Sequence, residues 1–408
     1  MKTLLKAVAT AALAAAALTA CNKDDNNKAG DLTPAEAEMK AIVEQYAPGV
    51  IYDIYGRLAA SSSDLYDLLN AANEKGVDNV SQAELDAICA KFLEARKYWE
   101  QSEAFLYGAA SDFGIDPHID TWPLDLSALA TALSNTEQVA QLEGEDGIAY
   151  AAGKLGKELL GFHGVEFIIF RDGANRTAES LRGVETDAAF SGKTVTGEQE
   201  LIYATAVAGD LRDNCYQLVV SWNPEAAEAY AERCEELEVP VSVSGSDLTY
   251  GENLLAATRR GSTYATWQGA IASILKSGCS NIANEVFSVK MGNAHSGEDI
   301  NYIESPYSKK SFDDFIDNIL SIQYTLYGAH DATSAKAHSI MAYAKSGNPT
   351  LADALEADLK ASVAALNACK AKGAFVDIYA DSSVQDAMDA IEKLDTDINN
   401  LADWFSRQ

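Results

Sequence analysis

The stretch SQAELDAICAKFLEARKYWEQSEAF, residues 81–105, decides the fold. It opens with Ser81 and Glu84, a capping-box pattern in which a hydroxyl and a carboxylate bond the free amides at the start of a helix. Apolar or small side chains then recur at three- and four-residue spacing, the period of an amphipathic helix: Leu85, Ile88, Phe92, Ala95, Trp99, Ser102 and Phe105. This stretch therefore predicts a long helix that reaches Phe105 and buries one face.

Helical signals continue along the chain. Thr33-Pro34-Ala35-Glu36 combines an N-cap, a proline in the first turn and a second capping box. Residues 124–223, 241–305 and 350–408 contain no proline, and alternation typical of strands is hard to find. The chain is predicted to be all-α, with helices that bury their apolar faces in bundles resembling four-helix bundles.

A change of composition divides the chain. The β-prone, Ser/Gly-rich segment from Val239 to Ser246 lies between two long helical regions. We expect an N-terminal helical domain over 33–238, a linker over 239–250 and a C-terminal helical domain over 251–408. The tetrapeptide Leu-Tyr-Gly-Ala occurs at 106–109 and again at 326–329, which hints that the two domains arose by duplication.

The charge balance limits the partners. The 408 residues include 61 Asp and Glu but 31 Lys and Arg, giving a formal charge of −30. Such a surface repels phosphate backbones, so nucleic acid is excluded as an expected partner. Cations and positively charged ligands are favoured instead.

The first residues are predicted to be a targeting signal. Lys2 and Lys6 precede a short apolar run, and the segment 1–20 has the architecture of a secretory signal peptide. It ends at Cys21 in a sequence that resembles the bacterial lipobox, so Cys21 is the expected lipidation site. A polar tether over 21–32 follows. We expect an outer-membrane lipoprotein of the cell envelope, on the periplasmic or surface face, that is anchored by lipid and does not span the bilayer.

The segment around His163 carries the most unusual chemistry. In a helix, His163 and Glu166 would project from one face, close enough to share an ion. The surrounding residues are apolar, and Gly161 and Gly164 each cost about 1 kcal/mol in a helix interior, which predicts a close backbone approach. A metal site and a structural ion pair that fixes the two domains are both compatible with this pattern.

Four motifs in order resemble the imelysin family. They are Gly161-Phe162-His163-Gly164-Val165-Glu166, which matches a GxHxxE motif; the helix from Arg96 to Gly108, with Trp99, Ser102, Glu103 and Gly108; the turn from Asp116 to Pro123, which ends in Asp120-Thr121-Trp122-Pro123; and Glu304-Ser305-Pro306-Tyr307-Ser308 followed by Phe312 and Asp317. The resemblance covers nearly all of the predicted mature chain. It implies a bacterial envelope protein, often iron-regulated, with two related helical bundles, a site near their junction and a role in iron uptake.

The resemblance also guides the expected ligands. His163 and Glu166 would bind a metal ion or an iron-bearing small ligand, with Glu103 and Asp120 completing the set, although Glu103 could equally be solvated. Such mixed nitrogen and oxygen donors suit Fe, with Zn or Mn as alternatives. A transport partner in the membrane is possible on this reading. Supporting roles fall to these residues of the motifs: Gly161, Gly164, Ser102, Trp122, Glu304, Ser305 and Tyr307.

The family also carries a metallopeptidase label. Zinc peptidases of the His-Glu-x-x-His type need two histidines one turn apart and an adjacent glutamate. No histidine in this chain is followed by glutamate, and Phe167 stands where the inverted motif would place its second histidine. Metal binding without hydrolysis is therefore favoured, and a metal-dependent peptidase is the alternative.

Overall fold

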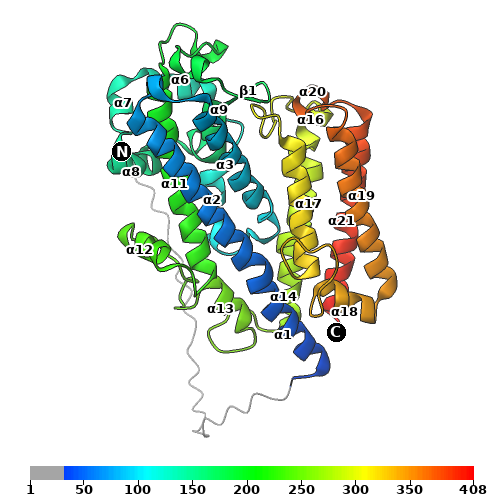
Figure 1. The fold of residues 1–408 in the computed structure, drawn as a ribbon. Coiled ribbons are helices and arrows are strands. Elements are labelled where there is room, and N and C mark those ends of the chain that lie inside the picture. The colour runs from blue at the N-terminus through cyan, green and yellow to red at the C-terminus, as the bar shows by residue number, and fades with distance from the viewer. Residues whose placement is uncertain (1–31) are drawn as a thin grey trace, which may run out of the picture.

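The computed structural model describes residues 32–408, which form an all-α protein as predicted (Figure 1). The predicted signal peptide, Cys21 and all but the last residue of the tether lie outside this range. Within it, no helix has both the length and the apolar composition that crossing a bilayer requires. The longest helices are α1 (Pro34–Tyr46), α2 (Asp53–Lys75), α3 (Gln82–Glu100), α11 (Gly197–Trp222), α17 (Ser311–Tyr327), α19 (Pro349–Lys370) and α21 (Ser382–Phe405).

Shorter elements connect these helices. The short α-helices are α4 (Ala109–Asp112), α5 (Asp116–Ile119), α6 (Leu126–Ser134), α7 (Thr136–Ala140), α8 (Gly144–Lys154), α9 (Gly161–Ile169), α10 (Ala178–Arg182), α12 (Glu228–Glu236), α13 (Tyr250–Leu255), α14 (Trp267–Ser273), α15 (Asn281–Glu285), α16 (Gly292–Ser296), α18 (Ile340–Gly347) and α20 (Phe375–Ile378). The π-helical segments are η1 (Ala47–Tyr52), η6 (Ile274–Ser280) and η7 (Val286–Lys290), and the 3₁₀ turns are η2 (Val77–Asn79), η3 (Glu103–Phe105), η4 (Lys157–Leu159) and η5 (Ala188–Phe190). The strands β1 (Phe170–Arg171) and β2 (Ala174–Asn175) form one antiparallel hairpin.

The helices stand in two groups (Figure 1). Helices α2, α3, α9 and α11 pack together on one side, and α17, α19 and α21 pack together on the other. Helix α3 also packs on α17, and the buried apolar side chains form one continuous core through both groups. The division into domains at 239–250 stays a prediction, and α13, just beyond that linker, packs on α1, η1 and α11.

The deciding stretch folds largely as expected, with one correction. Ser81 Oγ accepts the amide of Glu84, and Glu84 Oε2 accepts the amide of Ser81 at 2.8 Å, so the capping box is present. The helix ends at Glu100 and does not reach Phe105. Ser102 Oγ donates to the Trp99 carbonyl at 2.7 Å, and the chain continues as the 3₁₀ turn η3. In that turn the Ala104 amide donates to Ser321 Oγ on α17 at 3.1 Å, so the broken helix joins the two groups.

A close backbone approach occurs near each of the repeated tetrapeptides, at positions that are not equivalent. A Cβ on Gly278 of η6 would lie 2.1 Å from the Ala104 carbonyl oxygen, just before the first tetrapeptide. A Cβ on Gly49 of η1 would lie 2.9 Å from the carbonyl oxygen of Gly328, inside the second. Glycine is therefore needed at both approaches. The duplication of the two domains stays a prediction.

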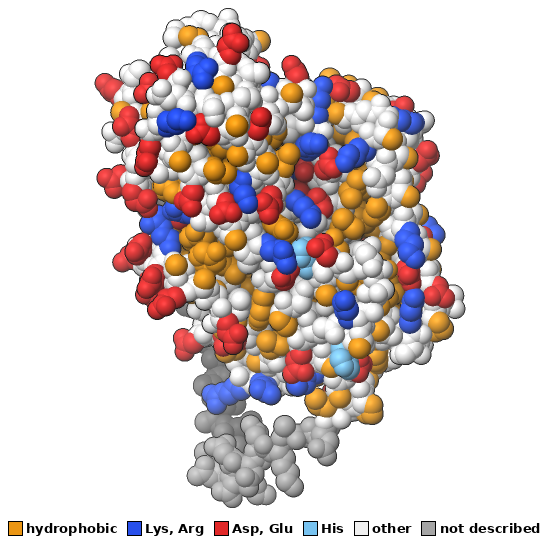
Figure 2. Space-filling view, viewed as in Figure 1, with side chains coloured by type: hydrophobic (Ala, Val, Ile, Leu, Met, Phe, Trp, Pro, Cys, Tyr) orange, Lys and Arg blue, Asp and Glu red, His pale blue; other side chains and the backbone are white. Residues whose placement is uncertain are grey.

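Charges are mixed over the visible surface. On the face shown in Figure 2, lysines and arginines are interspersed with acidic side chains and do not form one broad basic surface. The exclusion of nucleic acid stays a prediction from the net charge. The five cysteines that the structure describes are free and buried, in line with small apolar residues: Cys89, Cys215, Cys234, Cys279 and Cys369.

Candidate metal site

Helix α9 positions His163 through its two glycines. Gly161 begins the helix at φ +67°, and a Cβ there would lie 1.8 Å from the carbonyl oxygen of Ile119. A Cβ on Gly164 would lie 2.4 Å from the hydroxyl of Tyr203. The predicted close approach is thus present at both positions. It brings the end of α5, and with it Asp120, against α9.

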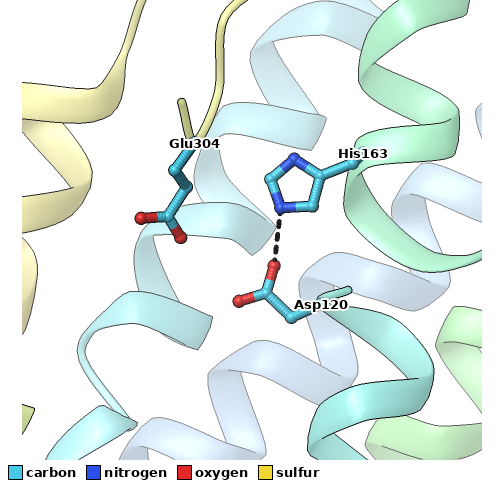
Figure 3. A group of neighbouring side chains, drawn as sticks. All are labelled: Asp120, His163 and Glu304. Atoms are coloured by element: carbon cyan, nitrogen blue, oxygen red, sulfur yellow. Dashed lines mark hydrogen bonds and ion pairs between the residues drawn. The ribbon is translucent and has the colours of Figure 1, made fainter. Parts of the chain in front are cut away.

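Three buried side chains converge from three parts of the chain (Figure 3). His163 comes from α9, Asp120 follows α5, and Glu304 precedes α17. His163 Nε2 lies 3.0 Å from Asp120 Oδ1. One donor atom from each of the three residues lies within 4.8 Å of the others, a grouping that could hold a metal ion. We call these residues the triad.

Glu166 lies on the other edge of the His163 ring. Its Oε2 is 3.5 Å from His163 Nδ1, so the predicted convergence of the two side chains is present. Its Oε1 accepts the amide and the hydroxyl of Ser308 at 2.8 and 2.6 Å. A carboxylate in this position orients an imidazole whose other nitrogen binds a metal. The geometry favours Glu166 as the partner that orients His163, and its role as a direct ligand stays a prediction.

Arg96 holds the acidic side of the triad. Its guanidinium donates to Asp120, and its Nη2 lies 2.5 Å from Glu304 Oε1 and 2.6 Å from Glu100 Oε1. Trp99 Nε1 donates to Asp120 Oδ2 at 2.7 Å. Two residues one turn apart on α3 therefore fix the orientation of the Asp120 carboxylate.

A buried lysine completes the group. Lys290 Nζ lies 3.2 Å from Glu304, 3.5 Å from Glu100 and 3.6 Å from Glu103. The full set, which we call the site cluster, consists of Arg96, Glu100, Glu103, Asp120, His163, Glu166, Lys290, Glu304 and Asp314. All of these residues are buried, and six carboxyl groups face two permanent cations.

The ionisation of the site cluster follows from burial and these contacts. Burial lowers the pKa of His163, but Asp120 and Glu166 raise it further, to about 9. Burial raises the pKa of Asp120, whereas Arg96 and His163 hold it below its ordinary value. Burial and Glu100 raise the pKa of Glu304 to about 7, against the influence of Lys290 and Arg96.

The triad fits a metal ion. Glu304 Oε2 and Glu166 Oε2 are buried without a hydrogen-bond partner among the described residues. A buried polar atom without a partner is costly and calls for an ion, a proton or a water. One imidazole nitrogen with carboxylate oxygens is a donor set that suits Fe, Mn or Zn.

A cavity gives access to the site cluster. It has a volume of about 260 Å³ and reaches Glu103, Asp120 and Lys290. Trp122 and Tyr302, whose ring centroids are 4.1 Å apart, form part of its wall.

The other predicted residues support the site without entering the triad. Glu103 lies beside it and pairs with Lys290. Ser305 Oγ donates to Asp314 at 2.5 Å, and the Tyr307 ring packs edge-on against Phe167 with centroids 5.1 Å apart.

His118 does not join the site. Its Nε2 lies 2.8 Å from Asp210, and both line a separate cavity of about 380 Å³.

Sequence reasoning missed Arg96, Glu100, Lys290 and Asp314. Arg96 and Glu100 stand in a stretch that the motifs had already marked, and both come from the buried face of α3, which was the available signal. Lys290 ends the π-helical segment η7, and the sequence carries no pattern that predicts such a segment.

Known proteins resemble this chain over most of its length. The family model described as Imelysin, which carries a peptidase label, matches residues 51–402. Iron-regulated protein A of Synechococcus elongatus is 24% identical over 314 residues, covering 77% of this chain and 71% of that protein.

Two solved structures share the fold. A protein of Parabacteroides distasonis, assigned as an iron-regulated protein A precursor, superposes with a TM-score of 0.72 at 26% identity, covering 92% of this chain and 97% of its own. An imelysin-like protein of Psychrobacter arcticum superposes with a TM-score of 0.59 at 14% identity, covering 90% and 94%.

Proposed function

Because this chain belongs to the imelysin family, we propose that it captures a single transition-metal ion, iron first, at the triad of Asp120, His163 and Glu304. The observation that carries the proposal is the buried convergence of these three donors in a cluster where carboxyl groups outnumber permanent cations. Taking charges out of water is expensive unless they are compensated, and a divalent ion would supply the missing positive charge.

Iron is proposed from the relatives and from the donors. Proteins named iron-regulated protein A resemble the chain in sequence and in structure. The triad offers one imidazole and two carboxylates, which suits iron better than the thiolate-preferring ions. The cavity of about 260 Å³ favours a small ion over a large iron chelate, since pockets for drug-sized ligands span roughly 300–1,000 Å³.

The test is metal titration with a matched control. Chelator-treated protein is titrated anaerobically with ferrous ion by calorimetry, and the wild type is expected to bind one ion. His163→Ala should weaken binding by roughly 100-fold or more, because loss of even an indirect partner of a ligand costs about 10–100-fold. His118→Ala is the control, since His118 is also paired with a buried aspartate but lies in a different cavity. Equal affinity in the wild type and His163→Ala would remove the proposal.

The peptidase alternative finds less support in the geometry. A hydrolytic mechanism needs a free carboxylate or imidazole to activate water. Glu166 instead accepts two hydrogen bonds from Ser308, and Glu103, the glutamate of the site cluster that lines the cavity, is paired with Lys290. Chelator-sensitive cleavage of an unfolded protein substrate that disappears in Glu166→Ala would favour the peptidase.

We further propose that the protein is held at the cell envelope by lipid on Cys21. The signal-like segment 1–20 and the lipobox resemblance support this placement. Cys21→Ser should move the protein from the membrane fraction to the soluble fraction, and an unchanged distribution would exclude the anchor.

A further inference from the structure

Lys290 has an unusual place in the molecule. It is the one lysine among residues 32–408 that is buried, with 1% of its surface exposed. It ends η7, and π-helical turns are frequent at functional sites. Its ammonium group lies among Glu304, Glu100 and Glu103, with the nearest oxygen at 3.2 Å.

Two of the three carboxylates around it, Glu100 and Glu103, belong to a second half of the site cluster. The triad is the first half and contains His163. Glu100, Glu103 and Asp120 form another group whose donor atoms lie within 4.8 Å of one another. Asp120 belongs to both groups, so its carboxylate bridges them. Proteins that bind two metal ions in a helical bundle use such shared carboxylates, and paired ions lie roughly 3.5–4 Å apart.

Glu103 is the residue that points to a cation in this second half. It is 5% exposed, it makes no side-chain hydrogen bond with any described residue, and it lines the cavity. Its one charged partner is Lys290 at 3.6 Å, a contact that Lys290 shares with two other carboxylates. A carboxylate buried in this way needs a cation or a proton beside it.

We propose that Lys290 is a built-in cation that fills the all-carboxylate half of the site cluster and limits the protein to one metal ion. The inference rests on the proposed function, since it presumes that the triad binds an ion. The ammonium group carries one positive charge and forms ion pairs with Glu100 and Glu103 of that half and with Glu304 of the triad. It forms no ion pair with Asp120, whose oxygens contact Arg96, Trp99 and His163. Without Lys290, three carboxylates would offer an oxygen-only site of the kind that suits Mn²⁺.

The cavity makes the second half reachable. Its wall includes Glu103 and Lys290, together with Asp116 and Glu285. The same wall also includes Asp120 and Lys157, so it carries four acidic residues and two lysines. A vacancy left by the lysine would therefore be open to a cation from solvent.

The test is the stoichiometry of Mn²⁺ binding. Lys290→Met keeps the length and flexibility of the side chain and removes the charge. Wild-type protein should bind one Mn²⁺ per chain, and Lys290→Met should bind two, with the electron paramagnetic resonance signal of an exchange-coupled pair. Lys393→Met is the control. Lys393 also pairs with a buried carboxylate, Asp358, but it lies on α21 and does not belong to the site cluster. It should bind one ion.

A second variant, Glu103→Gln, tests the inference even if Lys290→Met fails to fold. Glu103→Gln keeps the shape of the side chain and alters the half that Lys290 fills. It should weaken binding of the single ion far less than His163→Ala does. A loss as large as that of His163→Ala would place the ion in the all-carboxylate half and overturn the inference.

The outcomes separate the two proposals. Two ions in the wild type, or one ion in folded Lys290→Met, would overturn the role of Lys290 and leave metal capture standing. No ion in either protein would remove the proposed function and this inference with it.

Discussion

The protein buries two groups of charged side chains, and they differ in balance. The first is the site cluster, in which carboxyl groups outnumber permanent cations. The second, which we call the Arg176 cluster, consists of Arg171, Arg176, Glu185 and Glu200. In the Arg176 cluster two guanidinium groups face two carboxylates, and Arg176 contacts both oxygens of Glu200 at 2.9 Å.

This difference in charge balance distinguishes a structural ion-pair cluster from a candidate binding site. The Arg176 cluster is balanced in charge: Arg176 also donates to the Ile168 carbonyl, Glu185 accepts the amides of Thr186 and Asp187, and Glu200 Oε2, although it accepts no hydrogen bond from the described residues, lies 2.9 Å from Arg176. In the site cluster, Glu304 Oε2 has neither a hydrogen bond nor an ion-pair contact among the described residues, and Glu166 Oε2 has only the 3.5 Å contact with His163 Nδ1.

Burial raises the pKa of one carboxyl group in the Arg176 cluster, Glu200, to about 7. In the site cluster burial raises the pKa values of three carboxyl groups, Glu103, Glu304 and Asp314, so protons can supply more of the missing positive charge there.

The largest expected effect is on stability and concerns the Arg176 cluster. Glu200→Gln leaves Arg176 without its bidentate partner, and removing one member of a buried ion pair costs about 3–5 kcal/mol. We expect the free energy of unfolding, measured by urea denaturation, to fall by about that amount. The affinity for ferrous ion, measured on folded protein, should stay that of the wild type.

Metal titration of the same variant provides the contrast with His163→Ala. If Glu200→Gln weakened metal binding as strongly as His163→Ala, the two clusters would be coupled and the distinction between them would fail.

Much of the fold and the centre of the site follow from local sequence patterns. The capping box at Ser81 and the three- and four-residue spacing behind it predict α3, because they depend on contacts within one helix. The pairing of His163 with Glu166 also depends on helical spacing alone. Gly161 and Gly164 signal a close approach because only glycine tolerates it at low cost.

The rest of the site depends on contacts between distant segments. Arg96 meets Glu304 across 208 residues of sequence, and Lys290 reaches Glu100 across 190. In the sequence, these charged residues look like the polar face of an amphipathic helix. Their burial depends on how α3 packs on α17, and neither residue pattern encodes that packing. The end of α3 at Glu100 was missed for the same reason, since the turn that follows bonds to Ser321.

The smallest expected effect concerns Asp116, which lines the cavity beside the site cluster. Burial raises the pKa of Asp116 to about 7, and the nearby Asp120 and Glu285 add to the shift. Between about pH 4 and pH 7 the folded protein therefore holds a proton on Asp116 that the unfolded chain has lost. Stability falls as pH rises wherever the folded state binds more protons. The destabilisation by this carboxyl group should thus increase as the pH rises to about 7 and then stay constant.

Asp116→Asn removes that titration and should flatten the pH dependence of metal-free protein. One pKa unit corresponds to about 1.4 kcal/mol, and the open cavity screens part of the shift, so we expect the variant to gain about 1–2 kcal/mol on the wild type between pH 4.5 and pH 7.5. Urea denaturation in the presence of chelator measures this gain. A constant difference across that range would mean that the excess of buried carboxyl groups ends at the site cluster. A difference that increases with pH would mean that the excess of buried carboxyl groups extends from the site cluster to Asp116 in the cavity wall. The Arg176 cluster, in which the charges balance, has no such extension among the residues described for it.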